Sequence, residues 1–195
     1  LRPRLEMVCA SSDTSAEKYR RDYGFARATS DWRVLVDDPA VEAVVIATPQ
    51  SMHREIAVAA LERGKPVLCE KPLGDSLDDG AAMVAAAQAA GVANMTGFSY
   101  IRTPASRCAR QLIADGAIGA PTWFRAEHTE DFLHDPETPA NWRTSGMANG
   151  CMGDLAPHIL NAALALMGPI NRVMADVEIV HETRPGGAVT NDDHA

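Results

Sequence analysis

The stretch Val67-Leu68-Cys69-Glu70-Lys71-Pro72-Leu73 decides the fold class of this chain. Its apolar beginning, residues 67–69, predicts a buried strand that delivers a carboxylate and an ammonium group to its carboxyl end. Open α/β sheets bind their ligands in the crevice outside those ends. The proline after Lys71 removes a backbone donor and permits a cis peptide bond, which would fix the direction of the lysine. The lysine could then donate a hydrogen bond to a substrate, or it could form an inert surface ion pair.

Strands and helices alternate around this stretch. Short apolar runs predict strands at residues 5–10, 43–47, 67–69 and 92–96. Between them, helices are predicted at residues 14–23, 31–38, 51–63 and 76–90, with Gly24, Gly64 and Gly91 at three of their ends. Such alternation is typical of a parallel sheet covered by helices, so residues 1–97 are predicted to form a partial Rossmann-type domain.

The second half of the chain, residues 98–195, has a different pattern and is predicted to be an α+β domain. Helices are expected at residues 104–115 and 154–167, and strands at residues 122–128 and 170–183. A long polar loop, residues 131–152, carries Trp142-Arg143 in its middle. Loops of this length in compact domains are usually functional, so the pair is predicted either to cover an active site or to plug local packing.

The last long helix begins with Gly153-Asp154-Leu155-Ala156-Pro157-His158. Proline is tolerated in a first helical turn, so Asp154 and His158 should straddle the helix start. Their i, i+4 spacing can place both side chains on one face. A carboxylate beside an imidazole fixes its tautomer and stabilises its protonated form, as a general base requires. The plainer alternative is an N-cap aspartate with an ordinary helical histidine.

Several segments in this order resemble the Gfo/Idh/MocA family of nicotinamide-dependent oxidoreductases. They are residues 43–73 with Glu70-Lys71-Pro72, then Gly97-Phe98-Ser99-Tyr100, Trp142-Arg143 and Asp154-x-x-x-His158. The resemblance covers most of the chain. It implies NAD or NADP as cofactor, and hydride exchange with a secondary alcohol of a sugar, inositol or related polyol. It also implies an open, mostly antiparallel sheet in the second domain, whose free face would form a homo-oligomer.

The resemblance also implies roles for individual residues. In the catalytic group, His158 would take the hydroxyl proton, Asp154 would orient it, and Lys71 would donate a hydrogen bond to the substrate oxygen. The cofactor would lie against a second group, which consists of Ser11, Thr48, Pro49, His53, Glu70, Lys71 and Pro72. The substrate-binding residues would be Tyr100, Arg102, Trp142 and Arg143.

The chain departs from the family pattern at four places. It contains no Gly-x-Gly-x-x-Gly turn, whose amides hold the pyrophosphate, so it is expected to begin after that turn. It is also expected to end before the family's later strands and helices. Asn161 stands where the family usually has aspartate. Ser11-Ser12, where an acidic residue would bond the ribose, could accept a 2′-phosphate together with Lys18 and Arg20, or could simply cap a helix.

Composition excludes several other classes. The chain has 195 residues, 46% of them hydrophobic and 23% charged, as expected of a globular protein. Its net charge of −8 argues against nucleic acid and anionic membrane surfaces as partners. No apolar run is long enough to span a membrane. The four cysteines are far apart and lack zinc spacing, which predicts reduced thiols, a cytoplasmic protein and no metal.

Two alternatives to a dehydrogenase keep the same residues. A lyase or glycoside-cleaving enzyme could use bound NAD transiently, and it would turn over without a net change in nicotinamide absorbance. A non-catalytic sensor or scaffold could retain the fold without redox chemistry. The absent glycine turn favours the scaffold, whereas Lys71, Asp154 and His158 favour an enzyme.

Overall fold

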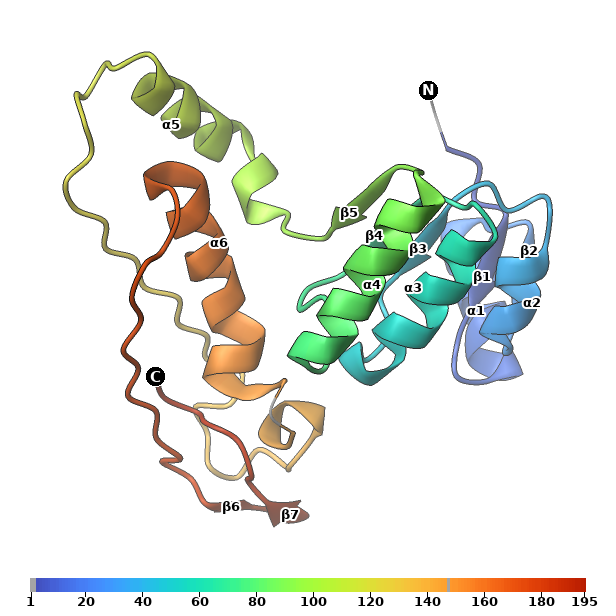
Figure 1. The fold of residues 1–195 in the computed structure, drawn as a ribbon. Coiled ribbons are helices and arrows are strands. Elements are labelled where there is room, and N and C mark those ends of the chain that lie inside the picture. The colour runs from blue at the N-terminus through green and yellow to red at the C-terminus, as the bar shows by residue number, and fades with distance from the viewer. Residues whose placement is uncertain (1–2, 147) are drawn as a thin grey trace. The chain divides into compact units, whose positions relative to one another are not determined.

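The computed structural model describes residues 3–146 and 148–195, which fold into two compact units, Leu1–Thr96 and Gly97–Ala195 (Figure 1). Each unit is described by itself. In the described part of the chain, no helix is long and apolar enough to cross a membrane.

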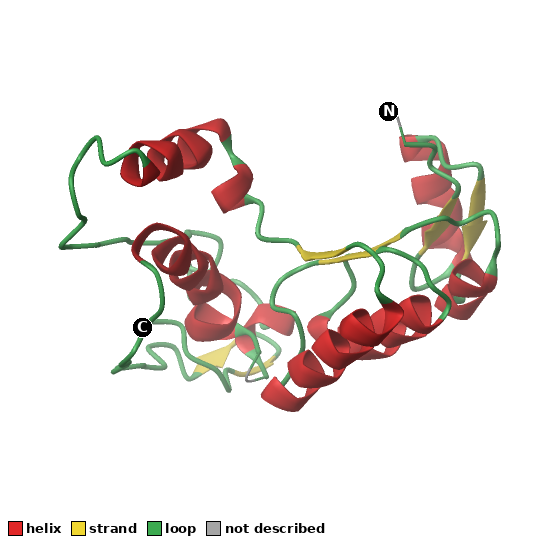
Figure 2. Ribbon diagram, turned by 45° about the horizontal axis from the view of Figure 1, so that its top comes forward, coloured by secondary structure: helices red, strands yellow, loops and turns green. Residues whose placement is uncertain are grey.

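The first unit alternates short strands with helices (Figure 2). In chain order its elements are β1 (Met7–Cys9), α1 (Asp13–Tyr23), β2 (Arg27–Thr29), α2 (Trp32–Asp37), β3 (Val44–Ile46), η1 (Gln50–Met52), α3 (His53–Glu62), β4 (Val67–Cys69), α4 (Leu77–Ala90) and β5 (Asn94–Thr96). Strands β3, β4 and β5 form a parallel sheet, and β1 pairs with β2, also in parallel. The predicted Rossmann-type class is confirmed, with β2 as a strand that the sequence patterns did not reveal.

Local signals set the helix boundaries of this unit. Ser12 and Ser76 cap α1 and α4, because each hydroxyl accepts a hydrogen bond from the amide of the third residue after it. Gly24 and Gly91 end the same helices in the left-handed conformation, with φ of 78° and 63°. The ends of the helices therefore fix where the intervening strands can start.

The core of the first unit lies beneath the β3–β4 pair. Ile46 and Cys69, the last residues of these strands, are each only 2% exposed. Helix α3 contributes Ile56, Ala57, Ala60 and Leu61 to the same cluster, and it packs along α4. Burial of this surface anchors the carboxyl ends of β3 and β4, so the residues that follow them emerge from a rigid base.

The second unit is built mainly from two helices and long connecting segments. Its elements are η2 (Tyr100–Arg102), α5 (Pro104–Ala114), η3 (Trp142–Thr144), the π-helical turn η4 (Cys151–Leu155), α6 (Ala156–Met167), β6 (Thr183–Arg184) and β7 (Gly187–Ala188). Helix α6 contacts α5, η2 and η4. Strands β6 and β7 form a two-residue antiparallel hairpin, and Glu178 makes an isolated antiparallel bridge with His194.

Two predicted strands of this unit are wrong. Residues 122–128 have no strand, and residues 170–183 carry only the bridge at Glu178 and the first residue of β6. Alternating side chains require only an extended backbone with one covered face, whereas a strand also requires a neighbour to pair with. Among the described residues neither segment has such a neighbour along its length, so the antiparallel sheet is small.

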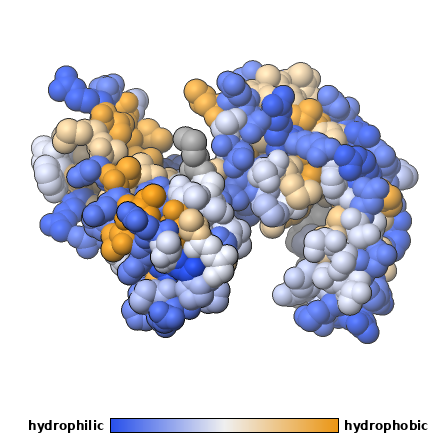
Figure 3. All heavy atoms as spheres, turned by 90° about the horizontal axis from the view of Figure 1, so that it is seen from below, coloured by the Kyte–Doolittle hydropathy of each residue, from blue (hydrophilic) through white to orange (hydrophobic). Residues whose placement is uncertain are grey.

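Large hydrophobic side chains remain on the surface of the second unit. The exposed ones along the predicted last strand are Ile170, Val173, Met174, Val177, Ile179 and Val180. Hydrophobic side chains are visible on the surfaces of both units in Figure 3. The pattern that predicted a strand at residues 170–183 therefore records an apolar row that this unit does not bury.

Candidate active site

The turn after β4 holds Lys71 at the carboxyl edge of the parallel sheet. The Glu70 amide extends the pairing by donating to the carbonyl oxygen of Ile46 at 2.9 Å. The Lys71–Pro72 peptide bond is cis, as the sequence allowed. Glu70 is exposed, Lys71 is half-buried, and the Lys71 amide donates to the Glu70 carboxylate at 3.3 Å. The lysine thus begins where ligands of such sheets bind.

The turn after β3 lies beside the turn after β4, and His53 connects them. The ring of His53, the first residue of α3, is 1% exposed. Its Nδ1 lies 3.0 Å from the carbonyl oxygen of Pro72, and its Nε2 lies 3.0 Å from that of Thr48. Within the described residues, the buried Oγ1 of Thr48 has no hydrogen-bond partner. The buried His53 ring therefore contacts the backbone of both turns that form the predicted cofactor wall, and its own side chain is not on the exposed surface of that wall.

Cys69, which precedes this turn, is inert. Burial raises the pKa of its thiol to about 12, and the nearby Glu70 carboxylate adds to the shift. Thiolate is the reactive form of cysteine, so the thiol stays protonated at neutral pH. All four cysteines are free, and the residues described hold no cluster of three or more metal-ligating side chains.

The serine pair that follows β1 has a structural use. Ser12 Oγ accepts the Ser15 amide at 3.2 Å and caps α1, while Ser11 is exposed. Lys18 bonds Asp22 at 2.6 Å, and Arg20 bonds Glu17 at 2.8 Å. The helix-cap interpretation is confirmed for Ser12. Both cations that could have met a 2′-phosphate already have carboxylate partners on their own helix.

In the second unit, His158 lies among aromatic rings. Its imidazole stacks on Tyr100, with ring centroids 4.3 Å apart and planes inclined by 25°. Phe98 meets it edge-on at 6.4 Å, and His128 lies 5.5 Å away. His128 in turn contacts the Glu130 carboxylate at 3.1 Å. The structure therefore brings together two residues singled out from the sequence, Tyr100 and His158.

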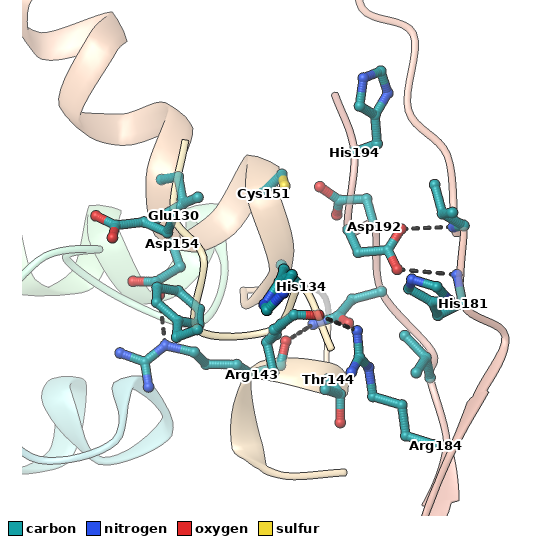
Figure 4. Close-up of a pocket in the computed structure, with 18 residues that line it drawn as sticks. Glu130, His134, Arg143, Thr144, Cys151, Asp154, His181, Arg184, Asp192 and His194 are labelled. Atoms are coloured by element: carbon teal, nitrogen blue, oxygen red, sulfur yellow. Dashed lines mark hydrogen bonds and ion pairs between the residues drawn. The ribbon is translucent and has the colours of Figure 1, made fainter. Parts of the chain in front are cut away.

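A second pair of predicted residues also meets. Arg143 Nε donates to Asp154 Oδ2 at 3.3 Å, and the Asp154 side chain is only 13% exposed (Figure 4). The Arg143 guanidinium stacks over the rings of Trp142 at 4.0 Å and Phe132 at 4.7 Å. An ion pair held between two aromatic faces has a fixed direction. Trp142 and Arg143 thus hold Asp154 in place, whereas the predicted orientation of His158 by Asp154 remains a prediction.

A cavity of about 270 Å³ borders this pair (Figure 4). Its wall is formed by the segment 130–134, by the turn that carries Asp154, and by residues of the C-terminal segment, including His181, Arg184 and Asp192. Arg184 is 6% exposed and donates to the carbonyl oxygens of Leu133 and Asp135 at 2.6 and 2.8 Å. These buried hydrogen bonds hold the wall of the cavity in place. The volume of the cavity lies just below the range of small-molecule sites, which begins at about 300 Å³.

The sequence patterns assigned no role to four residues of this neighbourhood: Phe98, His128, Glu130 and Phe132. Residues 122–128 were interpreted as a strand with mixed faces, which gave His128 no role, and Glu130 lies beyond that predicted strand. The alternation of His128 and Glu130 was the available signal, because an i, i+2 acid and imidazole on an extended segment share one side. Arg102 is exposed and belongs to η2, beside Tyr100.

Comparisons with known proteins extend over both units. A family model described as "Oxidoreductase family, NAD-binding Rossmann fold" matches residues 2–98, and the "GFO/IDH/MocA C-terminal domain" model matches residues 106–195. The chain belongs to the Gfo/Idh/MocA family. Both units match in the order that the motifs Glu70-Lys71-Pro72 and Asp154-x-x-x-His158 indicated.

Two of the relatives that the chain matches are named for carbohydrate substrates. Levoglucosan dehydrogenase of Pseudarthrobacter phenanthrenivorans is 40% identical over 92% of this chain and 47% of its own length. 1,5-Anhydro-D-fructose reductase of Ensifer adhaerens is 38% identical over 70% of this chain and 41% of its own. A solved levoglucosan dehydrogenase complex with NADH and levoglucosan superposes with a TM-score of 0.92 at 37% identity, over 98% of this chain and 53% of that one. The chain thus spans about half the length of these relatives.

Proposed function

We propose that the whole protein is an NAD(P)-dependent dehydrogenase that interconverts a secondary alcohol of a sugar or polyol and the corresponding ketone. The observation that carries the proposal is Lys71, held half-buried at the carboxyl edge of the parallel β3–β4–β5 sheet. Its support is the family membership of both units and the carbohydrate dehydrogenases and reductases among the relatives.

The residues at that edge suit a nicotinamide nucleotide. The Thr48 hydroxyl is buried and has no partner within the described residues, so it can bond a ligand group. Glu70 is an exposed carboxylate beside Lys71 and can accept hydrogen bonds from ribose hydroxyl groups. We assign Ser11, Thr48, Pro49, Glu70, Lys71 and Pro72 to the wall of this site, with His53 behind it. When bound, the nucleotide would accept or return the hydride.

The chain's own residues would then handle the proton and the oxygen. In the oxidative direction, the hydroxyl proton passes to the imidazole of His158 while the carbinol hydrogen leaves with its electron pair. The Lys71 ammonium donates a hydrogen bond to the substrate oxygen and stabilises the charge that grows on it. Asp154, fixed by Arg143, favours the protonated imidazole that results.

The substrate-binding residues would be Tyr100, Arg102, Trp142 and Arg143. Tyr100 lies against the His158 ring, so its phenol edge and Arg102 can contact sugar hydroxyls near the base. Trp142 is 51% exposed and can cover the apolar face of a ring. Because the named relatives act on levoglucosan and 1,5-anhydro-D-fructose, anhydro sugars are the first substrates to test.

We further propose a preference for NAD over NADP. The cations Lys18 and Arg20 are engaged with Asp22 and Glu17, and the Ser12 hydroxyl caps α1. A 2′-phosphate at this corner would have to compete with those carboxylates for the two cations. The free thiols also fit a cytoplasmic enzyme. Homo-oligomerisation through the apolar row at residues 170–183 remains a prediction.

The test is titration of the whole protein with NADH and NADPH, followed by nicotinamide fluorescence. We expect saturable binding of NADH and weaker binding of NADPH. Tighter binding of NADPH would overturn the cofactor preference. No binding of either nucleotide to a folded protein would overturn the dehydrogenase itself.

A further inference from the structure

The two turns that carry the cofactor wall are joined by one side chain. Strand pairing between β3 and β4 runs from Val44–Val67 to Ile46–Cys69, and the Glu70 amide adds one more bond to Ile46. Beyond this point the chain turns away from the sheet on both strands. His53 then contacts a carbonyl oxygen in each turn, at Thr48 and at Pro72. It therefore continues the connection where the backbone ladder ends.

The chemistry of the two contacts gives His53 a defined part. A carbonyl oxygen can only accept a hydrogen bond, so a ring nitrogen that bonds it must donate. A neutral imidazole has one N–H and bonds one of the two carbonyls, whereas a ring with a proton on each nitrogen bonds both. Both partners are main-chain carbonyl oxygens, so their positions are set by the backbone of each turn and not by the side chains of Thr48 and Pro72. The ring is 1% exposed and lies on the first turn of α3, whose other face packs in the core. Its position is fixed by that packing.

We propose that His53 is a positioning residue that sets the direction of Lys71 by holding the Pro72 carbonyl and sets the Thr48 turn by holding the Thr48 carbonyl. The consequence for catalysis rests on the function proposed above, whereas the structural clamp does not. Pro72 adjoins Lys71, so a fixed Pro72 carbonyl fixes the stretch of backbone from which the lysine side chain extends. Thr48 carries the buried hydroxyl assigned to the cofactor, so a fixed Thr48 carbonyl fixes the position of the hydroxyl that would bond the nucleotide.

Amide side chains can separate the two contacts. In His53→Asn the amide nitrogen can take the place of Nδ1 and keep the bond to Pro72 while that to Thr48 is lost. In His53→Gln the amide nitrogen reaches the place of Nε2 and keeps the bond to Thr48 alone. His53→Leu fills the space and keeps neither. Ile56→Val, one turn along α3, removes a buried methylene without touching either turn and serves as the control for stability.

Steady-state kinetics of the whole protein then give opposite patterns for the two amides. Misplacement of a catalytic group by about 1 Å can cost about 100-fold, so we expect kcat to fall at least about tenfold in the Gln and Leu variants. The Asn variant should keep kcat within about threefold while its KM for the nucleotide rises. The Ile56→Val control should match wild type in both constants. Equal losses in the Asn and Gln variants, or none in either, would overturn the proposal.

A second readout is independent of activity. Long-range proton–nitrogen NMR spectra of the histidine side chains, assigned with the His53→Leu variant, should show a His53 ring N–H that exchanges slowly with solvent. Exchange as fast as that of the exposed His134 would overturn the clamp, whatever the kinetics. A protected ring in a protein without hydride transfer would leave the clamp in place and remove only the dehydrogenase function.

Discussion

At the scale of single residues, the proposed chemistry depends most on Lys71. It follows a strand whose last residue is 2% exposed. A flexible lysine on a rigid base can be directed at one oxygen without ordering a loop. The Glu70 carboxylate accepts a hydrogen bond from the Lys71 backbone amide, which ties this acidic side chain to the same turn.

Substitution of this lysine should remove activity and leave the fold. Lys71→Met keeps the apolar stem and deletes the donor, so we expect kcat to fall by about 100-fold or more, as for loss of a proton-handling or charge-stabilising group. The exposed Lys18 supplies the control, because Lys18→Met removes an ammonium that pairs with Asp22 of its own helix. Steady-state rates and thermal unfolding of both variants check the prediction. A Lys71→Met enzyme with wild-type kcat would refute the role of Lys71.

The thiols give a prediction that needs no substrate. Burial, with Glu70, raises the pKa of Cys69 to about 12, so its reactive thiolate is nearly absent at neutral pH. Cys108 on α5 is exposed. Alkylation followed by peptide mass spectrometry should modify Cys108 rapidly and Cys69 only after denaturation. Rapid labelling of Cys69 in the folded protein would contradict the packing at the end of β4.

At the scale of elements, α3 and α4 are joined by an ion pair at their N-termini. Arg54 bonds Asp79 at 3.0 Å. This bond, and after it the Ser76 hydroxyl, holds the pKa of the Asp79 carboxyl group below its usual value. A carboxyl group with a lowered pKa in the folded state stabilises the fold above its unfolded pKa, about 4. That contribution is lost as the pH falls through about 4 towards the lower folded value.

The variant Asp79→Asn should therefore show a shallower loss of thermal stability on acidification. Its melting temperature should lie below that of wild type at pH 7, and the gap should narrow as the pH falls below about 4. Asp78→Asn, at the adjacent exposed position, is the matched control for helix charge. A constant gap between wild type and Asp79→Asn across the acid range would show that the pair contributes nothing.

The elements of the first unit were largely predictable from the sequence. Apolar runs, serine caps and glycine ends are local signals, and they placed α1, α3, α4 and the three-stranded sheet. Strand β2 was missed because Arg27-Ala28-Thr29 has no apolar run, and it forms by pairing with β1. The two false strands failed for the converse reason, since their alternation was present and their pairing partners were not among the described residues.

The site followed the same division. Lys71, Asp154 and His158 could be named because their motifs are contiguous in the sequence. The Arg143–Asp154 bond and the ring stack of Tyr100 on His158 join segments far apart in the chain, so only the fold shows them. The roles of His53 and His128 also depended on contacts made across turns, which spacing alone does not encode.

At the scale of the whole molecule, both units belong to one oxidoreductase family, and the chain spans about half the length of its named relatives. The central claim is hydride exchange with a carbohydrate alcohol. It differs from the lyase alternative in net redox change, and from the scaffold alternative in any turnover at all. Measuring carbohydrate conversion together with reduction of the nucleotide therefore separates all three.

The most direct measurement is transfer of deuterium from a carbohydrate labelled at the carbinol carbon, with levoglucosan first, to the oxidised nicotinamide nucleotide. The whole protein and its Lys71→Met variant are compared. We predict that wild type produces reduced nucleotide carrying the deuterium, with rising nicotinamide absorbance, and that the variant does not. Carbohydrate conversion without reduced nucleotide would contradict the claim and favour the lyase. No conversion of any sugar or polyol by a protein that binds the nucleotide would favour a scaffold.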